Sequence, residues 1–240
     1  MVEKLLIIDF GSQYTQLISR RLRELNIFSE IHPFQKISED LINSLKPKAI
    51  ILSGGPRSVT DEDAPFPPAY ILQLNIPILG ICYGQQALVQ MLGGLVEKSQ
   101  KTSEFGRAKV NKSNKRSDLL KNCFRNSMED VWMSHGDYVK KIPPGFEVIG
   151  SSDKAPYAII SNEEKKLFGV QFHPEVHHTP MGKQLLKNFS DIAKFRRNWT
   201  MEAYLDRAVL DIKAQVGSNK VICGLSGGVD SSVTAILVHK

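Results

Sequence analysis

The sequence predicts an α/β fold in which an open, doubly wound and mainly parallel sheet carries an antiparallel extension. Short apolar runs alternate with helical patterns through the first ninety residues, and this alternation is typical of a parallel sheet with helices on both faces. Shorter β-branched segments follow Gly94 and predict the antiparallel strands. A last apolar run near residue 221 leads into a glycine-rich loop. It predicts the first strand, loop and helix of a second α/β domain.

The first half of the chain supplies the parallel strands and their helices. Each strand is a short run that is apolar on both faces, as expected for a buried parallel sheet. Apolar residues at helical spacing occupy the intervals between them. The predicted order is a strand at residues 5–9, a helix at 14–25, a strand at 28–32, a helix at 39–45, and strands at 49–52 and 77–81.

The second half predicts an antiparallel addition, a closing helix and a domain boundary. The predicted strands are at residues 108–110, 130–134, 146–149, 157–160 and 167–172, and the closing helix is at 182–195. Another helix begins near Thr200 and ends at Gly217, a residue that commonly stops helices. We therefore predict one domain over residues 1–198 and the incomplete beginning of another over 199–240.

The stretch around Cys82 is the strongest candidate for a reactive site. The sequence Gly80-Ile-Cys82-Tyr-Gly84 joins an apolar strand directly to a helix, which is the context of a nucleophile elbow. The two glycines leave room for a strained turn, and the positive end of the following helix favours a thiolate. The alternative is a buried structural cysteine, which is the commoner role in cytosolic folds.

Two short motifs fall at the same predicted sheet edge as Cys82. The turn Ser53-Gly-Gly-Pro56 ends one strand, and a backbone N–H from Gly54 or Gly55 could join that of Tyr83 in an oxyanion hole. An ordinary tight turn is the alternative.

The strand at 167–172 delivers His173-Pro-Glu175, an extended segment in which side chains two apart point the same way. This spacing suits a carboxylate that orients an imidazole. The alternatives are a strand-end histidine with ordinary hydrogen bonds and a solvated glutamate. A zinc site with His177 and His178 is disfavoured because no thiolate pair or H-E-x-x-H motif accompanies them, so we predict no metal site.

Composition limits the partners. The formal charge of +6 is mild, and the basic stretch at residues 107–116 lacks interleaved aromatic residues, so no nucleic-acid partner is predicted. No apolar run reaches the length of a membrane span, so no membrane partner is predicted. Three widely spaced cysteines make no disulfide framework, which predicts a cytoplasmic protein.

Together, the motifs at residues 53–56, 80–84 and 171–175 resemble the class I, or triad, glutamine amidotransferases, over about residues 2–195. The resemblance implies that Cys82 attacks the carboxamide of glutamine, that His173 moves the protons and that Glu175 orients His173. It also implies an oxyanion hole at Tyr83 and Gly55. Contacts with bound glutamine are implied at Gln86, Ser134, Gly136 and Asp137, and no cofactor is needed for this half.

Two stretches, residues 9–16 and 132–137, are similar to the GMP synthase family within this class. The loop near the end of the chain resembles the pyrophosphate-binding loop of N-type ATP pyrophosphatases; it comprises Ser226, Gly227, Gly228, Val229, Asp230, Ser231 and Ser232. Its serines and backbone N–H groups at a helix start suit phosphate, and a glycine turn before a capped helix is the alternative.

For a complete enzyme the resemblance implies glutamine, ATP with Mg²⁺ and xanthosine monophosphate (XMP) as substrates and cofactors, GMP as product, and a homodimer formed through a further C-terminal domain. Three alternatives stay open. They are the glutaminase domain of another glutamine-dependent synthetase of the ATP-pyrophosphatase type, a stand-alone glutaminase subunit, and a catalytically silent fragment.

Overall fold

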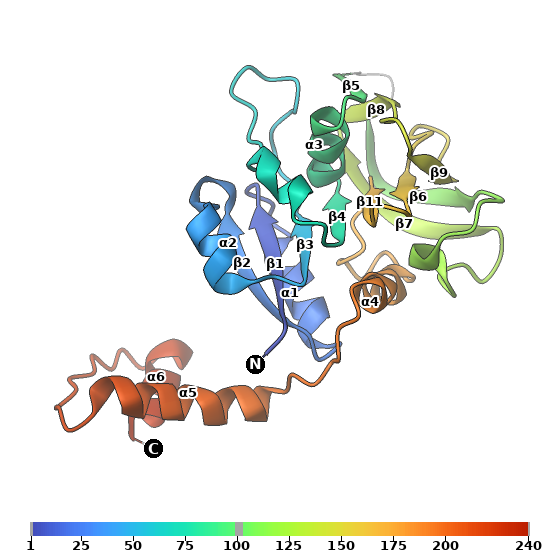
Figure 1. Cartoon of the computed structure of the whole chain (residues 1–240). Helices are drawn as coiled ribbons and strands as arrows, with labels where there is room; N and C mark the ends of the chain where they lie inside the picture. The colour runs from blue at the N-terminus through green and yellow to red at the C-terminus, as the bar shows by residue number, and fades with distance from the viewer. Residues whose placement is uncertain (1, 99–102, 240) are drawn as a thin grey trace. The chain divides into compact units, whose positions relative to one another are not determined.

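The computed structural model describes residues 2–98 and 103–239 (Figure 1). The first and last residues of the predicted domains, Met1 and Lys240, lie outside the described residues. The chain divides into two compact units, Met1–Arg197 and Asn198–Lys240. In the described part, no helix is long and apolar enough to cross a membrane.

The larger unit is built on a nine-stranded sheet of order β2-β1-β3-β4-β11-β10-β9-β6-β7. The strands from β2 to β11 in this order are parallel, and those from β11 to β7 pair antiparallel. The predicted fold class is confirmed. The strands are β1 Lys4–Asp9, β2 Phe28–Pro33, β3 Ala49–Leu52, β4 Ile78–Ile81, β6 Glu104–Lys112, β7 Met128–His135, β9 Glu147–Ser151, β10 Ile159–Asn162 and β11 Leu167–Val170.

Helices and a small second sheet complete this unit. The α-helices are α1 Thr15–Arg23, α2 Glu39–Leu45, α3 Tyr83–Met91 and α4 Gly182–Ile192, with short 3₁₀ turns η1 Phe34–Lys36, η2 Ala69–Gln73 and η3 Asp118–Leu120. An antiparallel pair, β5 Leu95–Lys98 with β8 Asp137–Lys141, was not among the predicted elements. Both strands are short, and β8 follows β7 after a single residue, so no turn-rich interval marks its beginning.

Apolar residues pack on both faces of the sheet. Along β1, Leu5 and Ile7 belong to one core cluster, while Leu6 and Ile8 belong to the other. Successive side chains of a strand point to opposite faces, and here both faces are covered. The first cluster includes apolar residues of α1 and α4, and the second includes those of α3. This burial on both sides explains why the parallel strands are continuously apolar in sequence.

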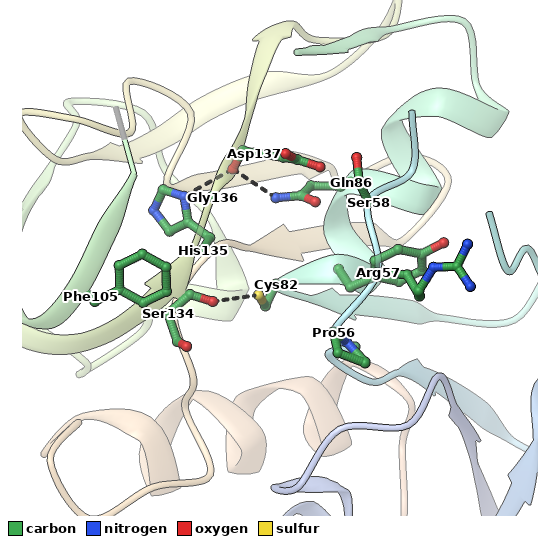
Figure 2. Close-up of a pocket in the computed structure, with 12 residues that line it drawn as sticks. Pro56, Arg57, Ser58, Cys82, Gln86, Phe105, Ser134, His135, Gly136 and Asp137 are labelled. Atoms are coloured by element: carbon green, nitrogen blue, oxygen red, sulfur yellow. Dashed lines mark hydrogen bonds between the residues drawn. The ribbon is translucent and has the colours of Figure 1, made fainter. Parts of the chain in front are cut away.

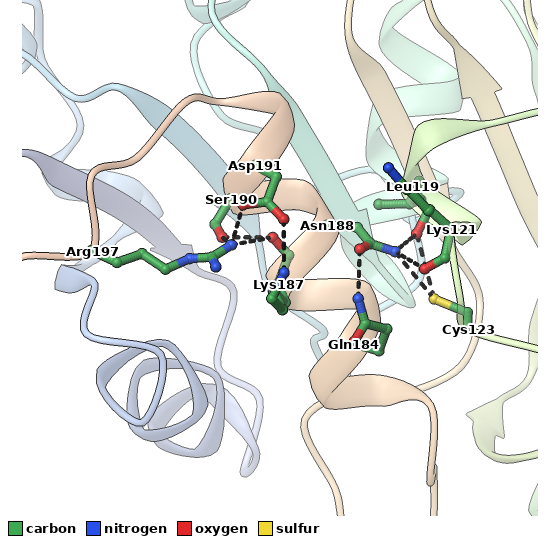
Figure 3. A network of polar contacts seen from close by, with 9 residues as sticks. All are labelled: Leu119, Lys121, Cys123, Gln184, Lys187, Asn188, Ser190, Asp191 and Arg197. Carbon is green, nitrogen blue, oxygen red and sulfur yellow. Dashed lines mark hydrogen bonds and ion pairs between the residues drawn. The ribbon is translucent and has the colours of Figure 1, made fainter.

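Polar contacts hold helix α4 to residues 119–121 on one side and to Arg197 on the other (Figure 3). The buried Asn188 amide donates to the carbonyls of Leu119 and Lys121 at 2.8 and 2.7 Å. Near the end of α4, the Arg197 guanidinium donates to the carbonyl of Lys187 at 3.1 Å and to the Ser190 hydroxyl at 2.9 Å. These bonds tie the segment that follows α4 back onto the last two turns of the helix. The end of the first unit is therefore held by specific contacts.

The smaller unit consists of α5 Met201–Val216, a loop and α6 Val229–His239. Thr200 caps α5 by accepting from the Ala203 N–H at 3.2 Å, and Gly217 ends it with a φ of 57°. The prediction of a strand near residues 221–225 is wrong. The segment forms no strand, and Ile222 is 98% exposed. A strand depends on backbone partners, and in the described part of this unit no neighbouring strand supplies them.

Candidate active site

Cys82 occupies the sharp turn between β4 and α3. Its backbone has φ 52° and ψ −108°, in a region that non-glycine residues rarely adopt. The Cys82 N–H donates to the Val170 carbonyl of the adjacent strand at 2.7 Å, which holds the turn in place. Strained backbone of this kind persists only where the surrounding structure determines it, and it concentrates at functional sites.

The two glycines beside Cys82 are required by close backbone contacts. A Cβ atom on Gly84 would lie 2.2 Å from the Leu52 carbonyl oxygen, and one on Gly80 would lie 2.5 Å from the Gly84 carbonyl oxygen. Real Cβ atoms do not come this near to backbone atoms, so no other residue fits without a shift of the chain. The local geometry is that of a nucleophile elbow.

The structure brings His173 and Glu175 to Cys82. The Nδ1 atom of His173 lies 2.7 Å from Oε1 of Glu175, and both residues are buried. The His173 N–H donates to the Trp132 carbonyl at 3.0 Å, and Thr179 donates to the His173 carbonyl at 2.8 Å. These contacts fix the backbone of the histidine and therefore the direction of its ring.

The surroundings of His173 shift its pKa strongly. Burial by itself lowers the pKa, but hydrogen bonds and charge interactions with Cys82 and Glu175 outweigh it and raise the pKa to about 10. The imidazole therefore holds its proton at neutral pH. An imidazolium beside a sulfur atom favours the thiolate form of a cysteine.

The predicted oxyanion donors lie at the same place. Gly55 and Tyr83 line a cavity together with Cys82. The N–H of Tyr83 is the first of α3 and has no carbonyl one turn earlier to accept it. A Cβ atom on Gly55 would come within 2.9 Å of the Phe10 carbonyl oxygen, so the backbone approach here requires glycine.

All four residues predicted to contact glutamine line this cavity, which has a volume of about 280 Å³ (Figure 2). They are Gln86, Ser134, Gly136 and Asp137. The Cys82 Sγ atom lies 3.4 Å from the Ser134 carbonyl oxygen. The Gln86 amide nitrogen donates to the Asp137 carbonyl at 3.0 Å and to Oε1 of Gln171 at 3.2 Å. Both of its N–H groups are thus engaged, and its oxygen remains to accept from a ligand.

Four residues that were not predicted as site residues also line the cavity. They are Arg57, Ser58, Phe105 and His135. Buried His135 places Nδ1 2.9 Å from the Asp137 carbonyl. Burial lowers the pKa of His135 and outweighs the opposite effects of the Asp137 carbonyl and Glu104. His135 belongs to the 132–137 stretch that drew attention in sequence. Phe105, 71% exposed on β6, carries no motif that would mark it.

The remaining sequence candidates lie elsewhere. His177 and His178 have ring centroids 3.6 Å apart, and His178 stacks on Trp132 at 4.4 Å. Among the described residues, no group of three or more His, Cys, Asp or Glu side chains is placed to hold a metal ion.

The loop Ser226–Ser232 precedes and begins α6 and is largely exposed. The hydroxyls of Ser231 and Ser232 lie 3.0 and 2.9 Å from the Gly228 carbonyl.

A cysteine at a strand-to-helix elbow, on a parallel sheet and beside a buried His–Glu pair, matches the architecture of an α/β amidotransferase. Residues 6–192 match the model of the family described as glutamine amidotransferase class-I. The chain belongs to this family. Residues 202–240 match the model described as NAD synthase.

Among known proteins, the chain is similar to the GMP synthase [glutamine-hydrolyzing] of Dinoroseobacter shibae, with 58% identity over 99% of this chain and 46% of that protein. It is 52% identical to the enzyme of the same name from Thermosipho melanesiensis, over 100% of this chain and 46% of that one. The predicted resemblance to GMP synthases is confirmed. The chain spans about half the length of the curated relatives that it matches.

Solved structures agree on the fold. A protein from Thermoplasma acidophilum described as a GMP synthase subunit superimposes with a TM-score of 0.67 at 28% identity, over 81% of this chain and 95% of that one. A glutamine amidotransferase from Thermotoga maritima superimposes with a TM-score of 0.58 at 20% identity, over all of both chains.

Proposed function

We propose that the larger unit hydrolyses glutamine to glutamate and ammonia through Cys82, His173 and Glu175. The observation that carries this proposal is the contact of His173 with Cys82 on one side and with Glu175, at 2.7 Å, on the other. A nucleophile, a base and a group that orients the base form the arrangement needed for covalent acyl transfer.

The reaction follows from the positions of these groups. The Cys82 thiolate attacks the side-chain carbonyl of glutamine, and the N–H groups of Tyr83 and Gly55 stabilise the resulting oxyanion. His173 gives its proton to the departing ammonia and then takes one from the water that cleaves the thioester. In the 280 Å³ cavity, the Asp137 carboxylate and the free oxygen of Gln86 are suited to the ammonium group of the substrate.

For the longer protein, we propose that this ammonia is transferred to XMP in an ATP-dependent synthesis of GMP. The similarity to GMP synthases over nearly the whole chain supports this step. The loop Ser226–Ser232 offers hydroxyls and backbone N–H groups at the beginning of α6, which is a donor set that phosphate accepts. Asp230 and the serine oxygens are of the hard type that Mg²⁺ prefers. We further propose a cytoplasmic homodimer without nucleic-acid or membrane partners.

The test is the release of glutamate from glutamine by the 240-residue chain and by a protein of the relatives' length. Cys82→Ser is the control. Release by both proteins, lost in the variant, is the expected result. Release by the longer protein alone would mean that the glutaminase is silent without the remaining domains.

A second measurement distinguishes GMP synthesis from the reactions of other glutamine-dependent synthetases. The longer protein is offered XMP or other acceptors with glutamine and ATP. Preference for another acceptor would place the chain in a different glutamine-dependent synthetase.

A further inference from the structure

A second cavity meets the glutamine cavity at Cys82. It has a volume of about 320 Å³ and is lined by Gly11, Ser12, Gln13, Tyr14 and His173 in addition to four residues that the cavities share. The shared residues are Gly55, Pro56, Cys82 and Ser134. His173 lines only the second cavity, whereas the predicted glutamine contacts Gln86, Gly136 and Asp137 line only the first. The sulfur atom therefore stands between two chemically different spaces.

The position of His173 indicates which part of the substrate each cavity holds. Its Nδ1 atom is hydrogen-bonded to Glu175, so Nε2 is the nitrogen that can exchange a proton with reacting atoms. The amide nitrogen must receive that proton as it leaves. The glutamyl body then occupies the first cavity, and the leaving nitrogen faces the second.

The wall of the second cavity is preformed. The Asp9 carboxylate accepts from the Gly11 N–H at 2.9 Å and from the Thr15 hydroxyl at 2.7 Å. The Ser12 hydroxyl accepts from the Tyr14 N–H at 3.1 Å. These bonds hold the segment between β1 and α1 in one conformation. The Tyr14 ring meets the His173 ring edge to face, with centroids 5.0 Å apart.

We propose that the second cavity is an amine subsite, through which the enzyme transfers the γ-glutamyl group of glutamine to small primary amines and to hydroxylamine. By the same route it cleaves N-substituted γ-glutamyl amides. This inference rests on the proposed glutaminase function. Ammonia is about the size of water, which takes up about 30 Å³ in the liquid, so a cavity of about 320 Å³ has room for a substituted nitrogen.

The step balances without any oxidant or reductant. In the acyl-enzyme, the Cys82 sulfur carries the γ-glutamyl carbonyl as a thioester. The neutral amine forms a carbon–nitrogen bond to that carbonyl as the carbon–sulfur bond breaks. The proton lost by the nitrogen passes to His173 and on to the sulfur. The products are the substituted γ-glutamyl amide and the restored cysteine, and this is the reverse of cleaving such an amide.

Tyr14 is the residue that sets the size limit. Among the residues that line only this cavity, Tyr14 has the largest side chain, and its ring lies against the imidazole that must meet the amine. Each methylene group that a pocket accepts or rejects changes a rate by about tenfold or more. Butylamine and methylamine differ by roughly three such groups, so we expect Tyr14→Ala to raise the ratio of butylamine to methylamine transfer at least about tenfold.

The experiment incubates the 240-residue chain, and the longer protein, with glutamine and either hydroxylamine, methylamine or butylamine. Mass spectrometry measures the γ-glutamyl products, and glutamate release is followed in parallel. Tyr14→Phe keeps the ring and should keep the wild-type ratio. Arg20→Gln, on the exposed face of α1, the helix that Tyr14 directly precedes, is the matched control. Thermal unfolding of each variant verifies that it is folded.

The outcomes separate the two proposals. Substituted products that depend on Cys82, with a ratio changed only by Tyr14→Ala, support the amine subsite. Glutamate release without any substituted product, at saturating amine, would overturn the subsite and leave the glutaminase intact. An unchanged ratio in folded Tyr14→Ala would also overturn it. Absence of glutamate release from both proteins would overturn the glutaminase and the subsite together.

Discussion

Oε1 of Glu175 lies 2.7 Å from Nδ1 of His173, and the glutamate has no exposed surface. The bond fixes which imidazole nitrogen faces Glu175 and leaves the other for Cys82. A buried carboxylate is costly unless it is paired, so this glutamate and the imidazolium depend on one another. Removal of the Glu175 carboxylate should therefore lower the pKa of His173, and removal of the imidazolium should destabilise the buried carboxylate.

Replacement of the nucleophile should separate the two halves of the proposed reaction. We expect Cys82→Ala to abolish glutamine hydrolysis, because the covalent step has no other sulfur at the elbow. In a protein of the relatives' length, synthesis with external ammonia should persist, since the acceptor site is separate. Glutamate release and ammonia-dependent product formation measure the two effects. Glutamine-dependent turnover in the variant would contradict the role of Cys82.

The supporting residues should rank in a definite order. His173→Ala should be nearly as damaging as loss of Cys82, because His173 serves both proton transfers. Glu175→Ala should be milder, because it leaves the nucleophile, base and oxyanion donors in place. Steady-state kcat for glutamine measures the order, with circular dichroism as a check of folding. A folded Glu175→Ala as inactive as Cys82→Ala would refute the assigned roles.

The raised pKa of His173 makes a prediction about stability. Its pKa is about 10 in the folded chain, against an ordinary value of 6.5. The folded state therefore holds a proton that the unfolded state releases between these values, so this stabilisation is complete below pH 6.5 and is lost as pH rises through about 10. We expect Glu175→Gln to lower the free energy of unfolding most below pH 6.5, with a difference that narrows toward pH 10.

Urea unfolding of wild type and Glu175→Gln over this pH range measures the difference. NMR titration of the His173 ring should show a lower pKa in the variant. A stability difference that grows with rising pH would mean that the proton is not held as described.

The glycine after the nucleophile should be intolerant of any side chain. In Gly84→Ala the new Cβ would lie 2.2 Å from the Leu52 carbonyl oxygen, and we expect a loss of about 3 kcal/mol in the free energy of unfolding. Gly136→Ala is the matched control, because nothing lies within 4 Å of its ideal Cβ position. Its change should stay within about 0.5 kcal/mol. Denaturant unfolding compares them, and equal losses would argue against the close approach at the elbow.

The two units should differ in their resistance to proteolysis. Neither α5 nor α6 has a buried residue, and Ile222 and Val229 are strongly exposed. We expect limited proteolysis to cut between residues 217 and 229 and to leave residues 2–197 intact. The 240-residue chain should not bind ATP with Mg²⁺ at useful affinity, because its loop is not held in a sheet. Saturable micromolar binding in calorimetry, lost in Ser226→Ala, would contradict this prediction.

The sequence alone determined the local parts of this protein. Continuous apolar runs specify buried parallel strands, and the glycines around Cys82 specify a tight elbow, because both depend on residues only a few positions apart. His173 and Glu175 could be paired in advance for the same reason, because they are two positions apart. The expected extended segment is wrong: Pro174 and Glu175 lie in a turn after β11, and this turn still brings the two side chains together. The roles of these residues in catalysis stay predictions.

Tertiary structure decided what depends on distant neighbours. Strand β11 lies beside β4, and this pairing brings His173 to Cys82 across about ninety residues of chain. Phe105 reaches the first cavity in the same way, and no sequence motif marks it. Tyr14 belongs to the 9–16 stretch, but only the fold places its ring against His173. The prediction of a strand near residue 221 was wrong because it, too, depended on distant neighbours. An apolar run becomes a strand only when another strand satisfies its backbone hydrogen bonds, and the sequence of the run does not show whether such a partner strand is present.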